Sequence, residues 1–313
     1  MNPLEGKLVV LVGGSGFVGT YLAQELLRRG ARLRIVSREP NRAIKLKPLG
    51  LLGQIQFLRC DVSDAANLRR AMQGADAAVY LVGSFSGNLG TLHNHAAQVA
   101  AEAARDEGAS AFVYLSAIGA DPQSDSGYAR TKAEGEEAVR AAFPRATILR
   151  PSAMFGDEDN FINLFAGLIG SYPVIPVFAP DAKLQPIWVD DVAEAVTSAL
   201  SDPGQHGGKI FEIAGPETMT MWDLNQRIAE AQGRRRHFVR VSDSVAGFVS
   251  KLPGSPMNGD QWTMLQRGNV ASGQLPGIQD LGITPRPLSL FLDRWMVRYR
   301  RNGRFSQRVA GLR

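Results

Sequence analysis

Residues 7–30 are the stretch of this 313-residue chain that most constrains its fold. Leu8–Val12 is an unbroken aliphatic run, which is typical of a strand covered on both faces in a parallel sheet. A glycine-rich turn, GGSGFVG, follows at once, and a leucine-striped helical pattern then continues to Gly30. This order predicts a helix N-terminus that points backbone N–H groups at the turn, which suits a pyrophosphate.

The glycines of this turn match a dinucleotide-binding fingerprint in two registers. Gly14, Gly16 and Gly19 have the common spacing, and Gly13, Gly16 and Gly19 have the wider one. Either match alone also fits an ordinary tight turn, but a preceding strand and a following helix are the context that the fingerprint requires. The turn does not end in Gly-Lys-Ser/Thr, which excludes a triphosphate-binding loop. We therefore predict that the chain binds a dinucleotide.

Strand and helix patterns alternate through the first half of the chain. This alternation predicts an α/β fold with a doubly wound parallel sheet, the Rossmann arrangement, in which ligands lie at the carboxyl ends of the strands. Strands are expected at residues 8–12, 31–37, 54–59, 75–82, 111–115 and 146–149. We predict a dinucleotide-binding domain over residues 1–150 and a smaller substrate-side lobe, interwoven with the sheet, over residues 151–284. Within that lobe a turn-rich segment is expected at residues 252–260.

Composition excludes several classes of protein. The single cysteine, Cys60, cannot form an internal disulfide, which favours a reducing compartment. The four histidines show no metal-ligand spacing, so no metal site is expected. Neither a leader peptide nor an apolar run of spanning length is visible, so we expect a cytoplasmic protein.

The net charge of +5 is concentrated in a basic amphipathic segment over residues 285–313. Eight arginines stand there against Asp293 alone, which leaves the rest of the chain slightly acidic. Apolar residues at helical spacing, from Leu288 to Tyr299, predict a last helix that packs on the body. The arginines suit an anionic membrane surface, on the inner face of the cytoplasmic membrane, or an acidic protein partner. Nucleic acid fits less well, because no base-reading motif is present.

A second chemical signal is the combination of Ser116, Tyr128 and Lys132. Ser116 ends the fifth expected strand, at the edge where ligands bind, and can hold a substrate oxygen. Tyr128 and Lys132 are four residues apart and share one helix face. A neighbouring ammonium favours the phenolate, so we expect a lowered pKa for Tyr128 and a role in proton transfer.

The end of the second strand bears on the choice of cofactor. An acid there accepts from the ribose of NAD, whereas an arginine pairs with the 2′-phosphate of NADP. Ser37 and Arg38 come first, and Glu39 follows one position later. This order favours NADP(H) and keeps NAD(H) open.

These motifs resemble those of the extended and atypical short-chain dehydrogenase/reductases. The resemblance spans residue 7 to about 300 and is carried by VGGSGFVG, Asp61-Val62, LSAIGA, YARTK, LRPSAMFG and PIWVDDVAEAV. More narrowly, the chain is similar to the branch that includes the nucleotide-binding accessory subunit of respiratory complex I and its bacterial relatives. Only twelve positions separate Ser116 from Tyr128, which argues against a nucleotide-sugar epimerase.

The resemblance implies a role for individual residues. Ser116, Tyr128 and Lys132 would form the catalytic set. Asp61 and Val62 would meet the adenine, and Pro151 and Ser152 would approach the nicotinamide. The full cofactor-binding set would be Gly13, Gly16, Phe17, Val18, Gly19, Ser37, Arg38, Asp61, Val62, Val82, Gly83, Lys132, Pro151 and Ser152.

Three hypotheses about function follow. The leading one is an NADP(H)-binding reductase-like protein of the complex I accessory type, which reduces a carbonyl or quinone-like substrate and associates with a respiratory complex. The second is a non-catalytic assembly subunit that holds NADPH tightly. The third is a dinucleotide-sensing regulator, which requires different affinities for the oxidised and reduced cofactor.

Overall fold

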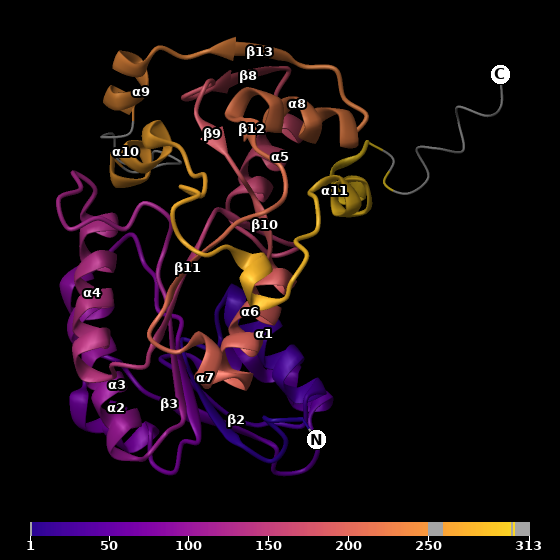
Figure 1. The fold of residues 1–313 in the computed structure, drawn as a ribbon. Helices are drawn as coiled ribbons and strands as arrows, with labels where there is room; N and C mark the ends of the chain where they lie inside the picture. The colour runs from indigo at the N-terminus through magenta and orange to yellow at the C-terminus, as the bar shows by residue number, and fades with distance from the viewer. Residues whose placement is uncertain (1, 250–258, 302, 304–313) are drawn as a thin grey trace. The chain divides into compact units, whose positions relative to one another are not determined.

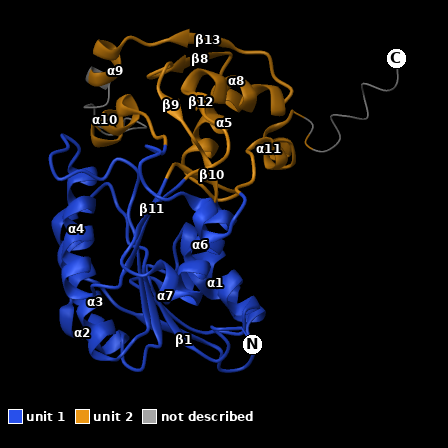
Figure 2. Cartoon of the chain, viewed as in Figure 1, with its two compact units in different colours: residues 1–151, 189–213, 271–284 blue, residues 152–188, 214–270, 285–313 orange. Residues whose placement is uncertain are grey.

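The computed structural model describes residues 2–249, 259–301 and 303. They form two compact units, shown in different colours in Figure 2. Unit 1 comprises residues 1–151, 189–213 and 271–284, and unit 2 comprises residues 152–188, 214–270 and 285–313. Most of the turn-rich segment predicted at residues 252–260 lies outside the described residues.

Unit 1 is built on a seven-stranded sheet in which every strand pair is parallel. The strand order is β11-β6-β5-β4-β1-β2-β3, so the order reverses between β1 and β4. The strands are β1 (Leu8–Val12), β2 (Arg32–Ser37), β3 (Ile55–Arg59), β4 (Ala77–Tyr80), β5 (Ala111–Leu115), β6 (Thr147–Pro151) and β11 (Ile210–Ile213). The predicted doubly wound α/β fold is confirmed.

Helices cover both faces of this sheet, as Figure 1 shows. On one face α2, α3 and α4 pack in sequence, and on the other α1 packs against α6. The helices of unit 1 are α1 (Phe17–Arg28), α2 (Ala65–Ala71), α3 (Ala96–Asp106), α4 (Gly127–Ala142), α6 (Val189–Ser201) and α7 (Pro203–His206). Further helical segments of unit 1 are η1 (Pro40–Leu49), η2 (Gly90–His95) and η3 (Ile278–Leu281).

Burial explains the uniform apolar runs of the central strands. All five residues of β1 are buried, since helices cover the sheet on both sides. On one face, residues of β4, β5, α3 and α4 form a continuous core in which the alanines of α3 allow close helix packing. This core supports the carboxyl ends of β4 and β5.

The two units interleave along the chain more than the predicted boundaries allow. Residues 189–213 and 271–284 belong to unit 1, although the sequence placed them in the second lobe. The physical reason is pairing and packing across long sequence separations. β11 pairs in parallel with β6, and α6 packs on α1. Strand propensity marks such elements but does not say which sheet they join.

Unit 2 contains short strands in three separate pairs. The pairs are β7 (Met154–Phe155) with β10 (Ile187–Trp188), β8 (Val174–Val177) with β13 (His237–Arg240), and β9 (Lys183–Leu184) with β12 (Met219–Thr220). Its helices are α5 (Ile162–Ser171), α8 (Met221–Ala231), α9 (Asp243–Val249), α10 (Gly259–Arg267), α11 (Ser289–Trp295) and η4 (Met296–Tyr299). Thr220 caps α8 in a capping box with Asp223, as its position before the helical pattern predicts.

An aromatic cluster anchors the C-terminal helix to the rest of unit 2. Phe291 of α11 stacks on Trp188 with ring centroids 3.9 Å apart, and Trp295 stacks on Phe155 at 6.5 Å. The predicted apolar stripe is therefore a packing surface. Arg298 is also used within unit 2, where it donates to the carbonyl of Asp157 at 2.7 Å.

Candidate functional site

The glycine turn between β1 and α1 needs glycines of both predicted registers. Gly13 has a φ of +82°, which lies in the left-handed region that glycine adopts without strain. A Cβ atom on Gly19 would lie 2.5 Å from the carbonyl oxygen of Gly14. The first turn of α1 can therefore approach the loop this closely only with glycine at that position, as in a phosphate-binding turn.

The N-terminus of α1 and the end of β2 both fit a dinucleotide. Among the described residues no side chain caps α1, and its first turn holds no acid, so its N–H groups and dipole face the turn. At the end of β2 the Ser37 hydroxyl is buried and has no hydrogen-bond partner in the described part of the chain. A buried hydroxyl without a partner is uncommon, and a ligand oxygen at this position would supply one.

Three further residues of the predicted cofactor set follow β2 and β3. Arg38 is exposed directly after Ser37, whereas Val62 is buried. The carboxylate of Asp61 accepts bonds from the backbone N–H and the hydroxyl of Ser63, at 3.0 and 2.8 Å. These bonds hold the pKa of Asp61 below its usual range. The side chain is therefore a carboxylate, and its bonds to Ser63 stabilise the local turn.

Lys132 joins the carboxyl ends of two neighbouring strands. Its side chain is 1% exposed, and Nζ donates to the carbonyl oxygens of Val82 at 2.9 Å and Leu115 at 2.8 Å. Burial lowers the pKa of Lys132 to about 7, although the nearby charge of Glu136 opposes that shift. The ammonium therefore lies at the carboxyl edge of the sheet, and two of its three protons are already bonded there.

Tyr128 lies one turn before Lys132 on α4, in an aromatic setting. Its ring stacks on Phe85 with centroids 4.2 Å apart and meets His93 edge-on at 5.1 Å. A Cβ atom on Gly83 would lie 3.5 Å from the tyrosine hydroxyl. Burial raises the pKa of Tyr128 to about 12, so the predicted lowering by Lys132 is wrong for this structure. Desolvation of the phenolate outweighs the ammonium, which is already bonded to carbonyl oxygens.

His93 is a fully buried anchor behind Tyr128. Its Nε2 accepts from the backbone N–H of Ser84 at 3.1 Å, and its Nδ1 lies 2.9 Å from the hydroxyl of Thr131. Thr131 donates its own proton to the carbonyl of Gly127, so the network assigns the imidazole proton to Nδ1. Burial, assisted by the charge of Lys132, lowers the pKa of His93 to about 3, so the ring stays neutral.

Ser116 belongs to a buried polar group that the sequence did not reveal. Its hydroxyl donates to Oε1 of Glu136, and Arg150 donates to both oxygens of the same carboxylate at 2.8 and 2.7 Å. Ser116 and Glu136 are 3% and 4% exposed. Burial disfavours the charge of Arg150, but the bond and charge of Glu136 outweigh it and raise the pKa of Arg150. Holding a substrate oxygen would require Ser116 to turn its proton away from Glu136.

One of these missed residues, Glu136, had a signal in the sequence. Glu136 lies four residues after Lys132, which itself lies four residues after Tyr128, so all three share one face of α4. His93 lies in η2, directly before α3, and had no such signal. Its contact with Tyr128 depends on how α3 and α4 pack, which no local spacing contains.

The predicted nicotinamide contacts lie where the chain passes from unit 1 to unit 2. Pro151 is the last residue of β6, and its carbonyl accepts from the backbone N–H of Ile118 at 3.0 Å. Ser152 begins the first segment of unit 2, and its hydroxyl donates to the carbonyl of Gln185 at 2.6 Å. Ser152 is 3% exposed, so its hydroxyl serves unit 2 in this structure.

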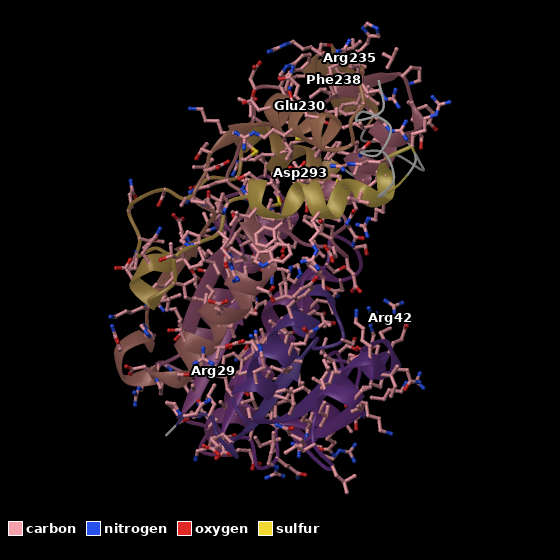
Figure 3. All side chains as sticks on the ribbon, turned by 90° about the vertical axis from the view of Figure 1, so that its right-hand side faces the viewer. Arg29, Arg42, Glu230, Arg235, Phe238 and Asp293 are labelled. Atoms are coloured by element: carbon pink, nitrogen blue, oxygen red, sulfur yellow. The ribbon has the colours of Figure 1, made fainter. Side chains whose placement is uncertain are left out.

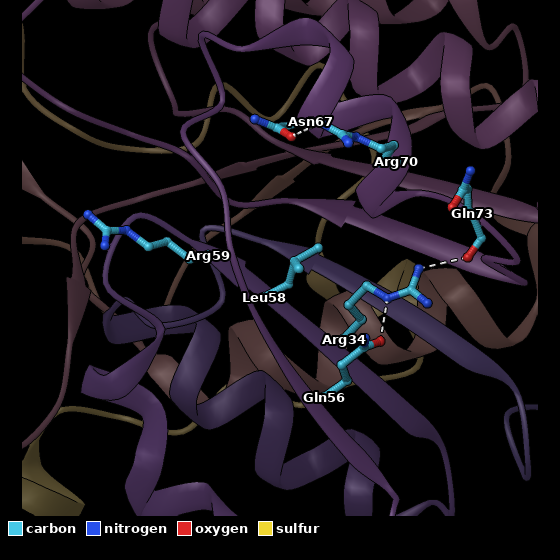
Figure 4. Close-up of a pocket in the computed structure, with 7 residues that line it drawn as sticks. All are labelled: Arg34, Gln56, Leu58, Arg59, Asn67, Arg70 and Gln73. Atoms are coloured by element: carbon cyan, nitrogen blue, oxygen red, sulfur yellow. Dashed lines mark hydrogen bonds between the residues drawn. The ribbon is translucent and has the colours of Figure 1, made fainter.

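A separate pocket of about 330 Å³ lies on unit 1, over β2, β3 and α2 (Figure 4). Arg34 spans it and donates to the carbonyl oxygens of Ala71 and Gln73 at 2.8 and 2.7 Å. Its lining is strongly basic and comprises Arg34, Gln56, Leu58, Arg59, Asn67, Arg70 and Gln73. None of the predicted site residues lines it.

Among the described residues, no group of three or more His, Cys, Asp or Glu side chains could hold a metal ion. No helix in the described ranges has the length and apolarity needed to cross a bilayer.

Comparison with known proteins agrees with this geometry. A family model described as NAD(P)H-binding matches residues 13–203. The chain is 31% identical to the mitochondrial NADH dehydrogenase [ubiquinone] 1 alpha subcomplex subunit 9 of Mus musculus, over 92% of this chain and 79% of the relative. It is 28% identical to a ceramide reductase of Caulobacter vibrioides, over 75% and 74% of the two chains. The NADPH complex of an Escherichia coli NADPH-dependent quinone oxidoreductase has the same fold, with a TM-score of 0.73, 22% identity, and 91% and 99% of the chains covered.

Proposed function

The chain belongs to the NAD(P)H-binding family and to that of the alpha subcomplex subunit 9 of mitochondrial NADH dehydrogenase, and from this premise we propose that its nucleotide is NADPH. The observation that carries the proposal is the end of β2. Arg38 stands exposed there, next to the unpaired Ser37 hydroxyl. The acid that would favour NAD, Glu39, is paired with Arg42 at 2.7 Å. A guanidinium is then the group best placed for a 2′-phosphate.

We propose that the protein is a reductase of a carbonyl or quinone-like substrate. When bound, NADPH supplies a hydride to the substrate. Tyr128 would give its hydroxyl proton to the substrate oxygen, and a pKa of about 12 keeps that proton in place until the oxygen becomes basic. Lys132 has one proton left for a ligand hydroxyl, and its cationic form would stabilise the phenolate that results. The reductase relative from Caulobacter vibrioides supports this class of reaction.

A specific observation favours a second function, in which the protein holds NADPH without turning it over. Ser116, the predicted orienting group, donates its proton to Glu136 inside a buried ion-paired group. Such a group stabilises the sheet edge with or without a substrate. On this proposal the nucleotide ties the β1–α1 turn to the ends of β2 and β4, and the protein contributes to the assembly of a respiratory complex.

The cofactor proposal is tested by identifying the nucleotide released when the purified protein is denatured. We expect NADPH or NADP⁺ from the wild-type chain. Arg38→Leu should weaken NADPH about tenfold or more relative to NADH, because a charge-assisted pair with the phosphate is lost. Arg32→Leu, at the other end of β2, is the matched control and should leave the preference unchanged. Release of NAD alone from the wild-type protein would refute the role of Arg38.

The reductase proposal is tested by Tyr128→Phe. With aldehydes and quinones as oxidants, NADPH consumption should fall at least about a hundredfold, because the proton donor is gone. The nucleotide should still copurify, and Tyr172→Phe, an exposed tyrosine of unit 2, should behave as the wild type. A wild-type protein that retains NADPH but consumes none with any oxidant supports the holding function instead.

We also propose that the basic segment over residues 285–313 contacts an acidic partner in a respiratory complex. Arg294 and Arg301 are exposed, whereas Arg298 and Arg300 donate to carbonyls of unit 2, at Asp157 and Ala231. Exchange of Arg294 and Arg301 for glutamine should reduce co-isolation with the complex and leave nucleotide content unchanged. Three arginines of the predicted segment lie outside the described residues, at positions 304, 308 and 313.

A further inference from the structure

The connection between β2 and β3 exposes an unusual amount of aliphatic surface. Four side chains within nine residues stand out into solvent. They are Ile44 at 52%, Leu49 at 57%, Leu51 at 82% and Leu52 at 107% relative exposure. Single exposed leucines are common on protein surfaces, but a group this dense marks an interaction site. We call residues 44–52 the leucine loop.

Hydrogen bonds hold the tip of the leucine loop in its outward position. The side-chain oxygen of Gln54 accepts from the backbone N–H of Leu51 at 2.8 Å, and its amide donates to the carbonyl of Ala31 at 2.8 Å. The backbone N–H of Gln54 donates to the carbonyl of Leu51 at 3.0 Å, across a turn in which Gly53 has a φ of +77°. Leu51 and Leu52 therefore lie on a hydrogen-bonded turn. These hydrogen bonds would break if the loop folded back onto the protein.

The loop is also fixed from beneath. Ala43 and Leu46 of η1 are completely buried, and η1 packs against α1, β2 and β3. Ile44 and Leu49 belong to the same helical segment, so they cannot turn inward without removing these two from the core.

Exposed basic side chains are interspersed with the exposed aliphatic ones along this stretch of the chain. Residues 39–52 contain one arginine and two lysines against Glu39 alone, a net charge of +2. Lys47 is exposed, and Arg42 projects from the edge of unit 1 in Figure 3, where it pairs with Glu39. A partner of this loop must meet two requirements. It must offer an apolar medium to the exposed leucines and negative charge to the basic side chains.

We propose that the leucine loop docks on an anionic lipid bilayer. Leu51 and Leu52 enter the boundary between headgroups and acyl chains, while Lys45, Lys47 and Arg42 lie against lipid phosphates. A bilayer surface meets both requirements at once, because its apolar interior begins just below its charged headgroups. An acidic protein surface would pair with the basic side chains but leave Leu51 and Leu52 in water. The proposal is independent of the nucleotide and of the basic segment at residues 285–313.

The test is sedimentation of the full chain with vesicles of phosphatidylcholine that contain about 30% phosphatidylglycerol. We expect binding that falls with added salt and is weak on phosphatidylcholine alone. The double variant Leu51→Ser/Leu52→Ser should bind about tenfold more weakly or worse, since it removes most of the inserted apolar area. Its thermal midpoint and nucleotide content should equal those of the wild type, because both side chains are exposed.

Three matched variants separate the alternatives. Lys47→Glu should weaken binding to anionic vesicles but not the residual binding to neutral ones. Gln54→Ala keeps both leucines but releases the turn, and should cause an intermediate loss. Leu290→Ser removes a leucine that is 64% exposed on α11, within the basic C-terminal segment, and should leave binding unchanged. Wild-type binding by the double variant, or loss of binding only in Leu290→Ser, would overturn the proposal. So would capture of the wild-type chain by an acidic protein with no binding to vesicles.

Discussion

The glycine turn lies at the same edge of the unit 1 sheet as a group of side chains that we call the Tyr128 cluster, but the two are built in opposite ways. The cluster comprises His93, Ser116, Tyr128, Lys132, Glu136 and Arg150. Among the described residues, no side chain caps the helix N-terminus at the glycine turn, and the buried Ser37 hydroxyl at the end of the neighbouring β2 has no hydrogen-bond partner. In the Tyr128 cluster most polar side chains already have hydrogen-bond partners within the protein. Lys132 donates to two backbone carbonyls, and both Ser116 and Arg150 donate to Glu136. The groups of the first region suit a ligand, whereas most polar groups of the second bond to one another.

The two regions differ in whether their side chains must rearrange before they can act on a ligand. The turn can hold a phosphate group without any change in its side chains. The Tyr128 cluster can act on a substrate only if Ser116 gives up its bond to Glu136, or if Tyr128 works without that serine. The contrast fits the holding function proposed above, in which the protein binds its nucleotide without turning it over. The following changes would break or sharpen this contrast.

The largest effect on stability is expected from Glu136→Ala. The change leaves the half-buried guanidinium of Arg150 and the buried hydroxyl of Ser116 without their carboxylate partner, and should lower the free energy of unfolding by about 3 kcal/mol. Denaturant unfolding measures it, with the exposed neighbour Glu137→Ala as control. A loss no larger than that of the control would show that the buried ion pair is not what completes the Tyr128 cluster.

Gly19→Ala should have the next largest effect on stability and the largest on binding. Its Cβ atom would be 2.5 Å from the Gly14 carbonyl, which forces α1 away from the turn at a cost of about 1–3 kcal/mol. The nucleotide should no longer copurify. Gly167→Ala in α5 adds a Cβ atom where nothing lies within 4 Å, and should retain both stability and nucleotide. Normal nucleotide content in Gly19→Ala would refute the turn as the phosphate site.

His93 gives the Tyr128 cluster a pH dependence that the glycine turn lacks. The folded pKa of about 3 lies below the ordinary value of 6.5, so the unfolded chain takes up the proton first as the pH falls. The contribution of neutral His93 is complete above about pH 6.5 and is lost towards pH 3, at up to ~1.4 kcal/mol per pH unit. In His93→Gln the slope of unfolding free energy against pH should be shallower over that range. The exposed His95→Gln should keep the wild-type slope.

The smallest effect is expected from Ser37→Ala, and its sign is informative. Removal of a buried hydroxyl without a partner should leave the nucleotide-free protein unchanged or more stable by up to about 1 kcal/mol. Affinity for the nucleotide should fall, because the ligand loses a hydrogen bond. Calorimetric titration with NADPH, beside thermal unfolding of the free protein, measures both. Destabilisation of the free protein would mean that Ser37 serves the fold rather than the ligand.

The sequence predicted well those elements whose determinants are local. β1 and β5 begin and end at the predicted residues, because an unbroken apolar run specifies each of them. The pKa of Tyr128 was predicted in the wrong direction. The spacing to Lys132 showed the charge, but it could not show that burial of the ring would outweigh it.

The sequence by itself therefore determined the doubly wound sheet, the glycine turn and the helix face that bears Tyr128 and Lys132. Each of these depends on residues within one or two turns or one strand. Only the tertiary structure decided that Ser116 bonds to Glu136, that His93 lies behind Tyr128 and that β11 joins the sheet beside β6. Those contacts join residues 20, 35 and about 60 positions apart, and burial, which sets their pKa values and hydrogen bonds, exists only once the helices have packed on the sheet.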